Sequence, residues 1–158
     1  MIDGKPGKSA REFASLLYVL YTCSMPINIF VNLPVKNLEK SKEFFTKLGF
    51  RFDKQFTDEN AACLVISDTI YSMLITEQFF TRFTKKRIAD ATTTTETINA
   101  IQLGSREDVD DMKDKAVAAG GKVHRDPEEH GWMYGQSIED LDGHLWEFFW
   151  MDPTKSGK

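Results

Sequence analysis

The chain is poor in cysteine. Its 158 residues include two, Cys23 and Cys63, which lie far apart in the sequence. Cys63 falls inside the apolar run at residues 61–66, a setting typical of a small buried side chain. A disulfide framework needs more cysteines at closer spacing, so the sequence excludes a disulfide-rich scaffold.

An excess of charge of one sign is also missing. The 20 basic and 24 acidic residues are interspersed and leave a net charge of -4. Proteins that bind nucleic acid or anionic membranes usually carry a basic patch, and the cluster at residues 85–87 is too short to form one. We therefore expect no nucleic-acid partner and no membrane partner. The 41% apolar content and the length suit one compact domain.

The apolar run at residues 13–23 is too short to span a bilayer. It has the length of a signal-peptide core and follows basic residues, but bulky residues precede Cys23 where a lipoprotein cleavage site needs small ones. We interpret residues 1–24 as an extension outside the fold of a cytoplasmic protein. The alternative is that they are a signal segment and that the protein is exported.

A single series of elements is present twice. A strand at 27–35 precedes a helix that Asn37 caps and Gly49 ends, and three short strands follow it at 50–56, 61–67 and 71–76. The second series has a strand at 97–103, a helix that Ser105 caps and Gly120 ends, and strands at 122–125, 132–138 and 144–151.

This duplication predicts an α+β fold of two tandem β-α-β-β-β modules. We expect this fold to occupy residues 25–152, with module one at 25–76, a connector at 77–95, module two at 96–152 and a tail at 153–158. One helix covers one face of each three-stranded meander and its crossover strand, so the other face is open. Two open faces side by side would form a curled mixed sheet with a central cleft, which is a common place for a ligand.

Glu147 is the residue that points to a function. Asp142-Gly143 predicts a tight hairpin, and the strand after it places Glu147 among aromatic and aliphatic neighbours. A carboxylate in such a strand needs a hydrogen-bond partner, a metal ion or a wet cavity. By parity Glu147 shares a strand face with Leu145 and Phe149 and faces the cleft.

Two stretches carry a resemblance to a known family. They are residues 30–41, with Phe44-Phe45 and Leu48-Gly49-Phe50, and residues 139–147. The chain resembles the glyoxalase, bleomycin-resistance and extradiol dioxygenase superfamily, also called vicinal oxygen chelate proteins, over about residues 25–152. The resemblance implies paired modules around a ligand cleft, and a homodimer that in some members pairs modules across subunits.

Metal-using members of that family hold one divalent ion with His, Gln or Glu side chains from four cleft strands. The resemblance places Glu147 at the last of these positions, and Phe30, Leu74 and Ile98 at the other three. These three side chains have no lone pair to donate, and a catalytic site normally needs about three protein ligands. We therefore expect no cofactor; the alternative is a divalent metal such as Ni, Zn, Mn or Fe at an atypical site.

Without a metal, Glu147 has two interpretations. It is either a structural acid that accepts hydrogen bonds from Asn28, Asn32 or Tyr134, or a desolvated carboxylate that acts as a general base or receives a cation. Its role as a catalytic residue depends on the second. The predicted ligand-binding residues are Asn28, Phe30, Asn32, Leu74, Ile98, Trp132, Tyr134 and Phe149.

The sequence leaves the choice between binding protein and enzyme open. The first hypothesis is a protein that binds an apolar or aromatic small molecule in a metal-free cleft. The second is a lyase or isomerase related to lactoylglutathione lyase, with an atypical metal or base. A third is an interaction protein whose cleft is filled.

Overall fold

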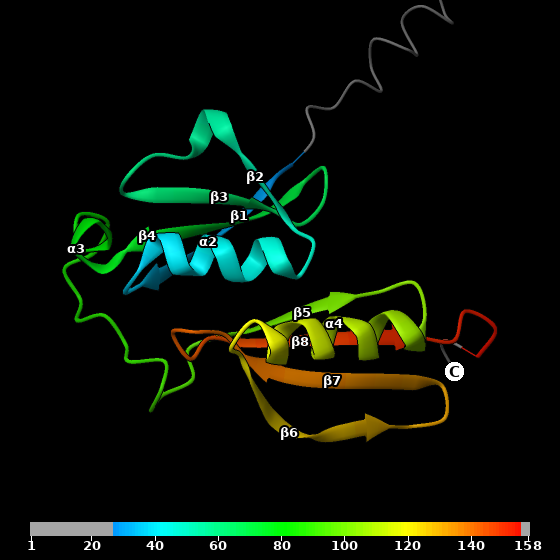
Figure 1. Cartoon of the computed structure of the whole chain (residues 1–158). Coiled ribbons are helices and arrows are strands. Elements are labelled where there is room, and N and C mark those ends of the chain that lie inside the picture. The colour runs from blue at the N-terminus through cyan, green and yellow to red at the C-terminus, as the bar shows by residue number, and fades with distance from the viewer. Residues whose placement is uncertain (1–26, 156–158) are drawn as a thin grey trace, which may run out of the picture.

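A computed structural model describes residues 27–155 of the chain (Figure 1). They form two four-stranded mixed sheets, each with one long helix. This confirms the expected α+β fold of two β-α-β-β-β modules. The predicted extension at residues 1–24 lies outside the described residues, as do Cys23 and residues 156–158 of the predicted tail.

The first module places its last strand in the middle of its sheet. The strand order is β1-β4-β3-β2, with β1 and β4 parallel and the other pairs antiparallel. Its elements are β1 (Ile29–Val35), α2 (Leu38–Lys47), β2 (Arg51–Asp53), the 3-10 turn η1 (Lys54–Phe56), β3 (Ala61–Val65) and β4 (Ile70–Thr76). The short helix α3 (Glu77–Phe80) then begins the connector.

The second module repeats this topology. Its order is β5-β8-β7-β6, with β5 and β8 parallel. Its elements are β5 (Ile98–Gln102), α4 (Arg106–Ala118), β6 (Lys122–Glu129), β7 (Met133–Glu139) and β8 (Leu145–Met151). β6 is longer than the sequence predicted and contains two register shifts. In Figure 1 each helix lies along its own sheet.

Local sequence signals fix both helices. The Asn37 side chain accepts a hydrogen bond from the Lys40 backbone N–H at 3.0 Å, and Ser105 does the same for Asp108 at 3.1 Å. Each bond satisfies one of the free N–H groups at a helix start. Gly49 and Gly120 follow the helix ends with φ of 98° and 105°, which a glycine adopts without strain.

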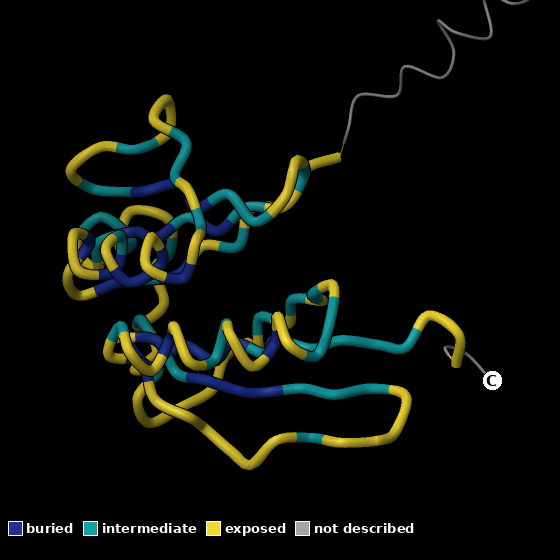
Figure 2. The backbone as a smooth tube through the Cα atoms, turned by 45° about the vertical axis from the view of Figure 1, so that its right-hand side comes forward, coloured by how far each residue is buried: buried dark blue, intermediate teal, exposed yellow. Residues whose placement is uncertain are grey.

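The core lies between the helices and the sheet faces that they cover. Its buried side chains come from both modules and include Leu33, Leu74, Phe44, Phe45, Val109, Ala116, Ile138, Trp146 and Phe148. The Phe45 and Trp146 rings lie 5.0 Å apart, so a helix of one module contacts a strand of the other. In Figure 2 the buried segments gather in the interior while β6 is exposed along most of its length. The sheet face away from the helix is called here the open face.

The hairpin turn between β7 and β8 joins the two modules. The Asp142 carboxylate accepts hydrogen bonds from the Lys36 backbone N–H at 2.9 Å and from the Ser41 hydroxyl at 3.1 Å. A ring nitrogen of His144 lies 2.7 Å from the Pro34 carbonyl oxygen. These contacts hold the N-terminal end of α2 against the second module.

Asp140 organises the inside of the same turn. Its carboxylate accepts hydrogen bonds from the backbone N–H groups of Asp142 and His144 and from the Trp146 indole, all at 3.0 Å. Burial raises the pKa of Asp140 above its ordinary value. Asp140, Asp142 and His144 are therefore buried and hydrogen-bonded, while Leu141 of the same turn is exposed.

The two sheets stay separate at their inner edges. β1 and β5 each end a sheet and pair with one neighbour only, so within residues 27–155 no strand ladder joins the modules. The expected curled mixed-sheet fold is therefore built from two four-stranded sheets, one for each module. None of the helices in this part of the chain has the length and apolar character needed to cross a membrane.

Candidate functional site

On the open face of the second module, one residue from each of the four strands lies in a row, and two of these four residues are charged. Residues that pair directly share a sheet face, and the register pairs Ala100 with Glu147, Glu147 with Ser137, and Ser137 with Arg125. Arg125 therefore stands two strands from Glu147 on the same face. Its side chain is long enough to reach across Ser137.

Arg125 is held between two carboxylates. Its Nη2 atom lies 2.6 Å from Glu147 Oε1 and 2.8 Å from Glu128 Oε2. The hydrogen bond to Glu147 raises the pKa of Arg125, and the bond to Glu128 adds to this effect. Hydrogen bonds from His130 and then Arg125 lower the pKa of Glu128. Glu128 is thus negatively charged at neutral pH, and its carboxylate shares one guanidinium with the carboxylate of Glu147.

A cavity of about 220 Å³ opens beside this cluster. Apolar atoms of Met133 and Phe149 form its walls, and Gly135 lies opposite Phe149 in the strand register. A Cβ atom on Gly135 would meet its nearest neighbours at 3.5 and 3.6 Å, an ordinary contact. The missing side chain of Gly135 therefore leaves room on the sheet surface. The lining residues are Arg125, Glu128, Met133, Gly135, Gln136, Glu147 and Phe149.

The residues around Glu147 do not fit the divalent metal site that the resemblance implies. The Glu147 carboxylate is engaged by the Arg125 guanidinium, which a metal ion would have to displace. Its row neighbours Ala100 and Ser137 offer no carboxylate, imidazole or thiolate. Within residues 27–155 no three His, Cys, Asp or Glu side chains are grouped closely enough to hold a metal ion.

The predicted site residues are only partly brought together. Glu147 and Phe149 both line the cavity. Ile98 pairs with Leu145 at the exposed edge of the same open face, with half of its surface accessible. Phe30 and Asn32 lie on the open face of the first module, where the Phe30 ring stacks on Tyr71 with centroids 4.7 Å apart.

Two of the predicted positions face the helices instead. Leu74 pairs with Leu33, is 0% exposed and belongs to the core, so Met73 takes the open-face position expected of Leu74. Tyr134 packs against the core, and its hydroxyl donates a 2.6 Å hydrogen bond to Asp110 of α4. Asn28 precedes β1 and Trp132 lies in the loop before β7, both exposed.

The structure also corrects the expected partners of Glu147. Its hydrogen bond comes from Arg125, and not from Asn28, Asn32 or Tyr134. The sequence analysis missed Arg125 and Glu128 as cavity residues. The sequence does show that Arg125 is a basic residue in the predicted strand that lies two strands away from that of Glu147. It does not show which sheet face Arg125 takes, because register shifts lie on both sides of it.

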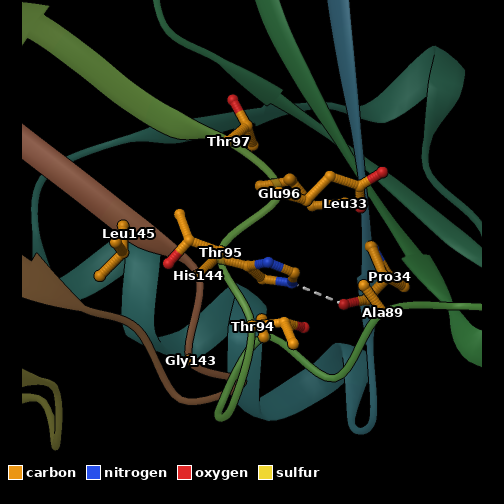
Figure 3. A pocket seen from close by; sticks show the side chains of 11 residues that line it. Leu33, Pro34, Ala89, Thr94, Thr95, Glu96, Thr97, Gly143, His144 and Leu145 are labelled. Carbon is orange, nitrogen blue, oxygen red and sulfur yellow. Dashed lines mark hydrogen bonds between the residues drawn. The ribbon is translucent and has the colours of Figure 1, made fainter.

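Further hollows lie elsewhere in residues 27–155. Figure 3 shows a cavity at the joint between the modules, where the His144 ring points at the Pro34 carbonyl and Thr94 to Thr97 pass close by. Its volume is about 20 Å³, room for little more than one water molecule. A larger hollow, of about 370 Å³, lies along α2 and is lined by charged and polar side chains with Phe52.

Comparison with protein families gives one match. The model of the Glyoxalase/Bleomycin resistance protein/Dioxygenase superfamily matches residues 27–148. Comparison with curated proteins gives no match.

Several solved structures share the fold. A hypothetical protein from S. aureus is 28% identical, with a TM-score of 0.68 over 82% of this chain and 98% of that chain. A glyoxalase/bleomycin resistance protein/dioxygenase family enzyme from Burkholderia phytofirmans PsJN is 14% identical, with a TM-score of 0.65 over 77% and 96%. A bleomycin-binding protein complexed with bleomycin is 17% identical, with a TM-score of 0.54 over 78% and 97%.

Proposed function

Because the chain belongs to the glyoxalase/bleomycin resistance protein/dioxygenase superfamily, we propose that it binds an apolar or aromatic small molecule without a metal. The binding site is the open face of the second module. The observation that carries this proposal is the cavity of about 220 Å³ between Phe149, Met133 and the Arg125–Glu147 pair. Apolar walls with a few polar groups at one side are the usual make-up of a small-molecule site.

Support for binding without a metal comes from the Arg125 contact. A divalent ion at Glu147 would have to displace a guanidinium and would find two carboxylates at most, Glu147 and Glu128. Catalytic metal sites normally have three protein ligands. The solved bleomycin-binding protein, which has the same fold, supports the idea that such a scaffold can hold an organic molecule.

We further propose that the functional unit is a homodimer. Within residues 27–155, β1 and β5 each pair along one edge only, and they expose large apolar side chains: Phe30 is 46% and Ile98 is 50% accessible. Free strand edges with apolar residues pair readily with another chain. A second copy placed against these edges would cover the open faces and enclose the cavity. Native mass spectrometry should show a dimer that Ile98→Glu converts to a monomer, and a monomeric unmodified protein would refute this part.

The binding proposal is tested with small aromatic probes and a variant that fills the cavity. Saturation-transfer NMR with benzyl alcohol should show binding to the unmodified protein. Gly135→Leu places an isobutyl group in the cavity and should abolish the signal. Gly49→Leu is the control for added bulk, because nothing lies within 4 Å of a Cβ atom at residue 49. The positive φ of residue 49 means that this variant will be less stable than the unmodified protein. Equal binding by the unmodified protein and Gly135→Leu would refute the assigned site.

The second candidate function is a glyoxalase-like lyase or isomerase. It is favoured by the position of Glu147 at the wall of the cavity, where its carboxylate could accept a proton from a bound substrate once Arg125 moves away. This candidate predicts turnover of a hemithioacetal that disappears in Glu147→Ala. Assays without added metal and with Ni, Zn, Mn or Fe separate it from the binding proposal, which predicts no turnover in any of them.

A further inference from the structure

We propose that the ligand of this cavity carries a positively charged nitrogen, an amine or amidinium group attached to its apolar or aromatic body. Glu147 and Glu128 would receive this group in place of Arg125. The inference rests on the proposed function and adds the charge of the ligand to it. It starts from the arrangement of the three charged side chains that line the cavity.

The cavity has more negative than positive charge. Two carboxylates, Glu147 and Glu128, contact a single nitrogen atom of Arg125. The remaining row neighbours, Ser137 and Ala100, carry no charge, and the amide of Gln136 bonds to Asp110 and Tyr134 away from the cluster. His130 contacts Glu128 and is not a lining residue. An anionic ligand would meet two carboxylates, whereas a cationic one would meet the excess charge of opposite sign.

Arg125 can leave the cluster without disturbing the core. Its side chain is 46% exposed, and β6, which carries it, is an edge strand exposed along most of its length. Register shifts lie on both sides of Arg125, so its strand is not held by a regular ladder there. An exposed ion pair contributes little to stability, so solvating the guanidinium costs little. In the free protein, the Arg125 guanidinium therefore takes the position that the cationic group of a ligand would take.

An apolar group on the ligand would favour the replacement of Arg125 by the cationic group of that ligand. Glu147 is 27% exposed in the free protein, and a ligand that covers Phe149 and Met133 would remove water from its carboxylate. A carboxylate deprived of water gains more from a well-placed cation than one in solvent. A ligand that joins both groups would thus supply the apolar contact and the charge together.

The test uses three probes of the same shape and different charge: benzylamine, benzyl alcohol and benzoate. Two-dimensional NMR titrations of the whole chain give the dissociation constants. We expect benzylamine to bind about tenfold more tightly than benzyl alcohol, a difference that one favourable charge pair can supply, and benzoate to bind least. A preference for benzoate, or equal binding of amine and alcohol, would overturn the inference.

Three variants then identify the groups responsible. Arg125→Ala removes the cation that the protein itself places between the two carboxylates, and should raise the preference for benzylamine over benzyl alcohol several-fold. Glu147→Gln should reduce the preference for benzylamine over benzyl alcohol. Lys122→Ala removes a positive charge from the same strand outside the cavity and controls for the net charge of the protein.

The outcomes separate this inference from the proposed function. If benzyl alcohol binds and Arg125→Ala does not raise the preference for the amine, the cavity is a ligand site but Arg125 does not occupy a cation site. If Lys122→Ala raises that preference as much as Arg125→Ala, long-range charge explains the effect and the inference fails. If none of the probes binds the unmodified protein, the proposed function itself is refuted.

Discussion

The two modules share one topology but carry different chemistry on their open faces. Equivalent positions across the four strands can be compared directly from the strand registers. In the first module they are Asn32, Met73, Cys63 and Asp53; in the second they are Ala100, Glu147, Ser137 and Arg125. The second module has an acid in its central strand and a base at its edge.

The first module has no such pair. Met73 stands where the second module has Glu147, and Asp53 stands where it has Arg125. The Asp53 carboxylate accepts a hydrogen bond from the Gln55 backbone N–H at 2.8 Å and so serves the turn beside it. Burial and then the Asp53 charge raise the pKa of the Cys63 thiol, which is typical of an inert cysteine. One scaffold thus supports one row with a buried thiol and a single acid, and another row with a paired acid and base.

The hairpin turns of the two modules should differ most in their tolerance of mutation. Asp140→Asn leaves one acceptor oxygen for three donors, so the buried Trp146 indole or a backbone N–H loses its partner. We expect a loss of about 3 kcal/mol in the free energy of unfolding. The matched change, Asp68→Asn in the exposed β3–β4 turn, should cost less than about 0.5 kcal/mol. Urea denaturation measures both, and equal losses would contradict the difference.

Two of the left-handed glycines, Gly143 and Gly49, make a second comparison. Both have positive φ, 94° and 98°, but a Cβ atom on Gly143 would lie 2.8 Å from the Thr92 backbone nitrogen while one on Gly49 would meet nothing. Gly143→Ala should therefore cost about 2 kcal/mol and Gly49→Ala about 1 kcal/mol. Thermal unfolding of both variants provides the check. A larger loss for Gly49→Ala would contradict this expectation, because it would show that Ala91 and Thr92 can move away from residue 143 at little cost.

Exchanging the central residues of the two rows should have the smallest effect. Met73→Glu places a carboxylate in a row whose far end holds Asp53 and which has no cation, so the pKa of the new acid is raised. We expect a loss of about 1 kcal/mol at pH 7. The loss should shrink as pH falls through that raised pKa and vanish below the ordinary pKa of the unfolded chain, where the acid is neutral in both states. Glu147→Met removes one half of an exposed pair and should change stability by less than this. Urea denaturation at pH 4 and pH 7 distinguishes the two variants.

The fold could be predicted from the sequence because its signals are local. Asn37, Ser105 and Gly49 each act within a few residues of their position, and each has the predicted role. The hairpin at Gly143 also places Glu147 on the open face as expected. Alternation along β8 is clear, since Trp146 and Phe148 are both fully buried.

The charged cluster could not be predicted because it depends on register between strands. In β4 the apolar residues run nearly without interruption, so parity alone does not show that Leu74 faces the helix and Met73 the open face. In β6 the shifts around Arg125 change which residues face the cavity. A one-residue displacement exchanges the two faces of a strand, and the sequence carries no local mark of it.

The strand order has a consequence for how the chain is assembled during synthesis. In each sheet the strand made last is inserted between the first and the third. Until β8 leaves the ribosome, β5 has no neighbour to pair with, and Asp142 cannot yet secure the entrance of α2. While the second module is being made, the first module therefore lacks the contacts that Asp142 makes with it. A slow or stalled translation of residues 140–151 would prolong the period in which its free edges can pair with the wrong chain.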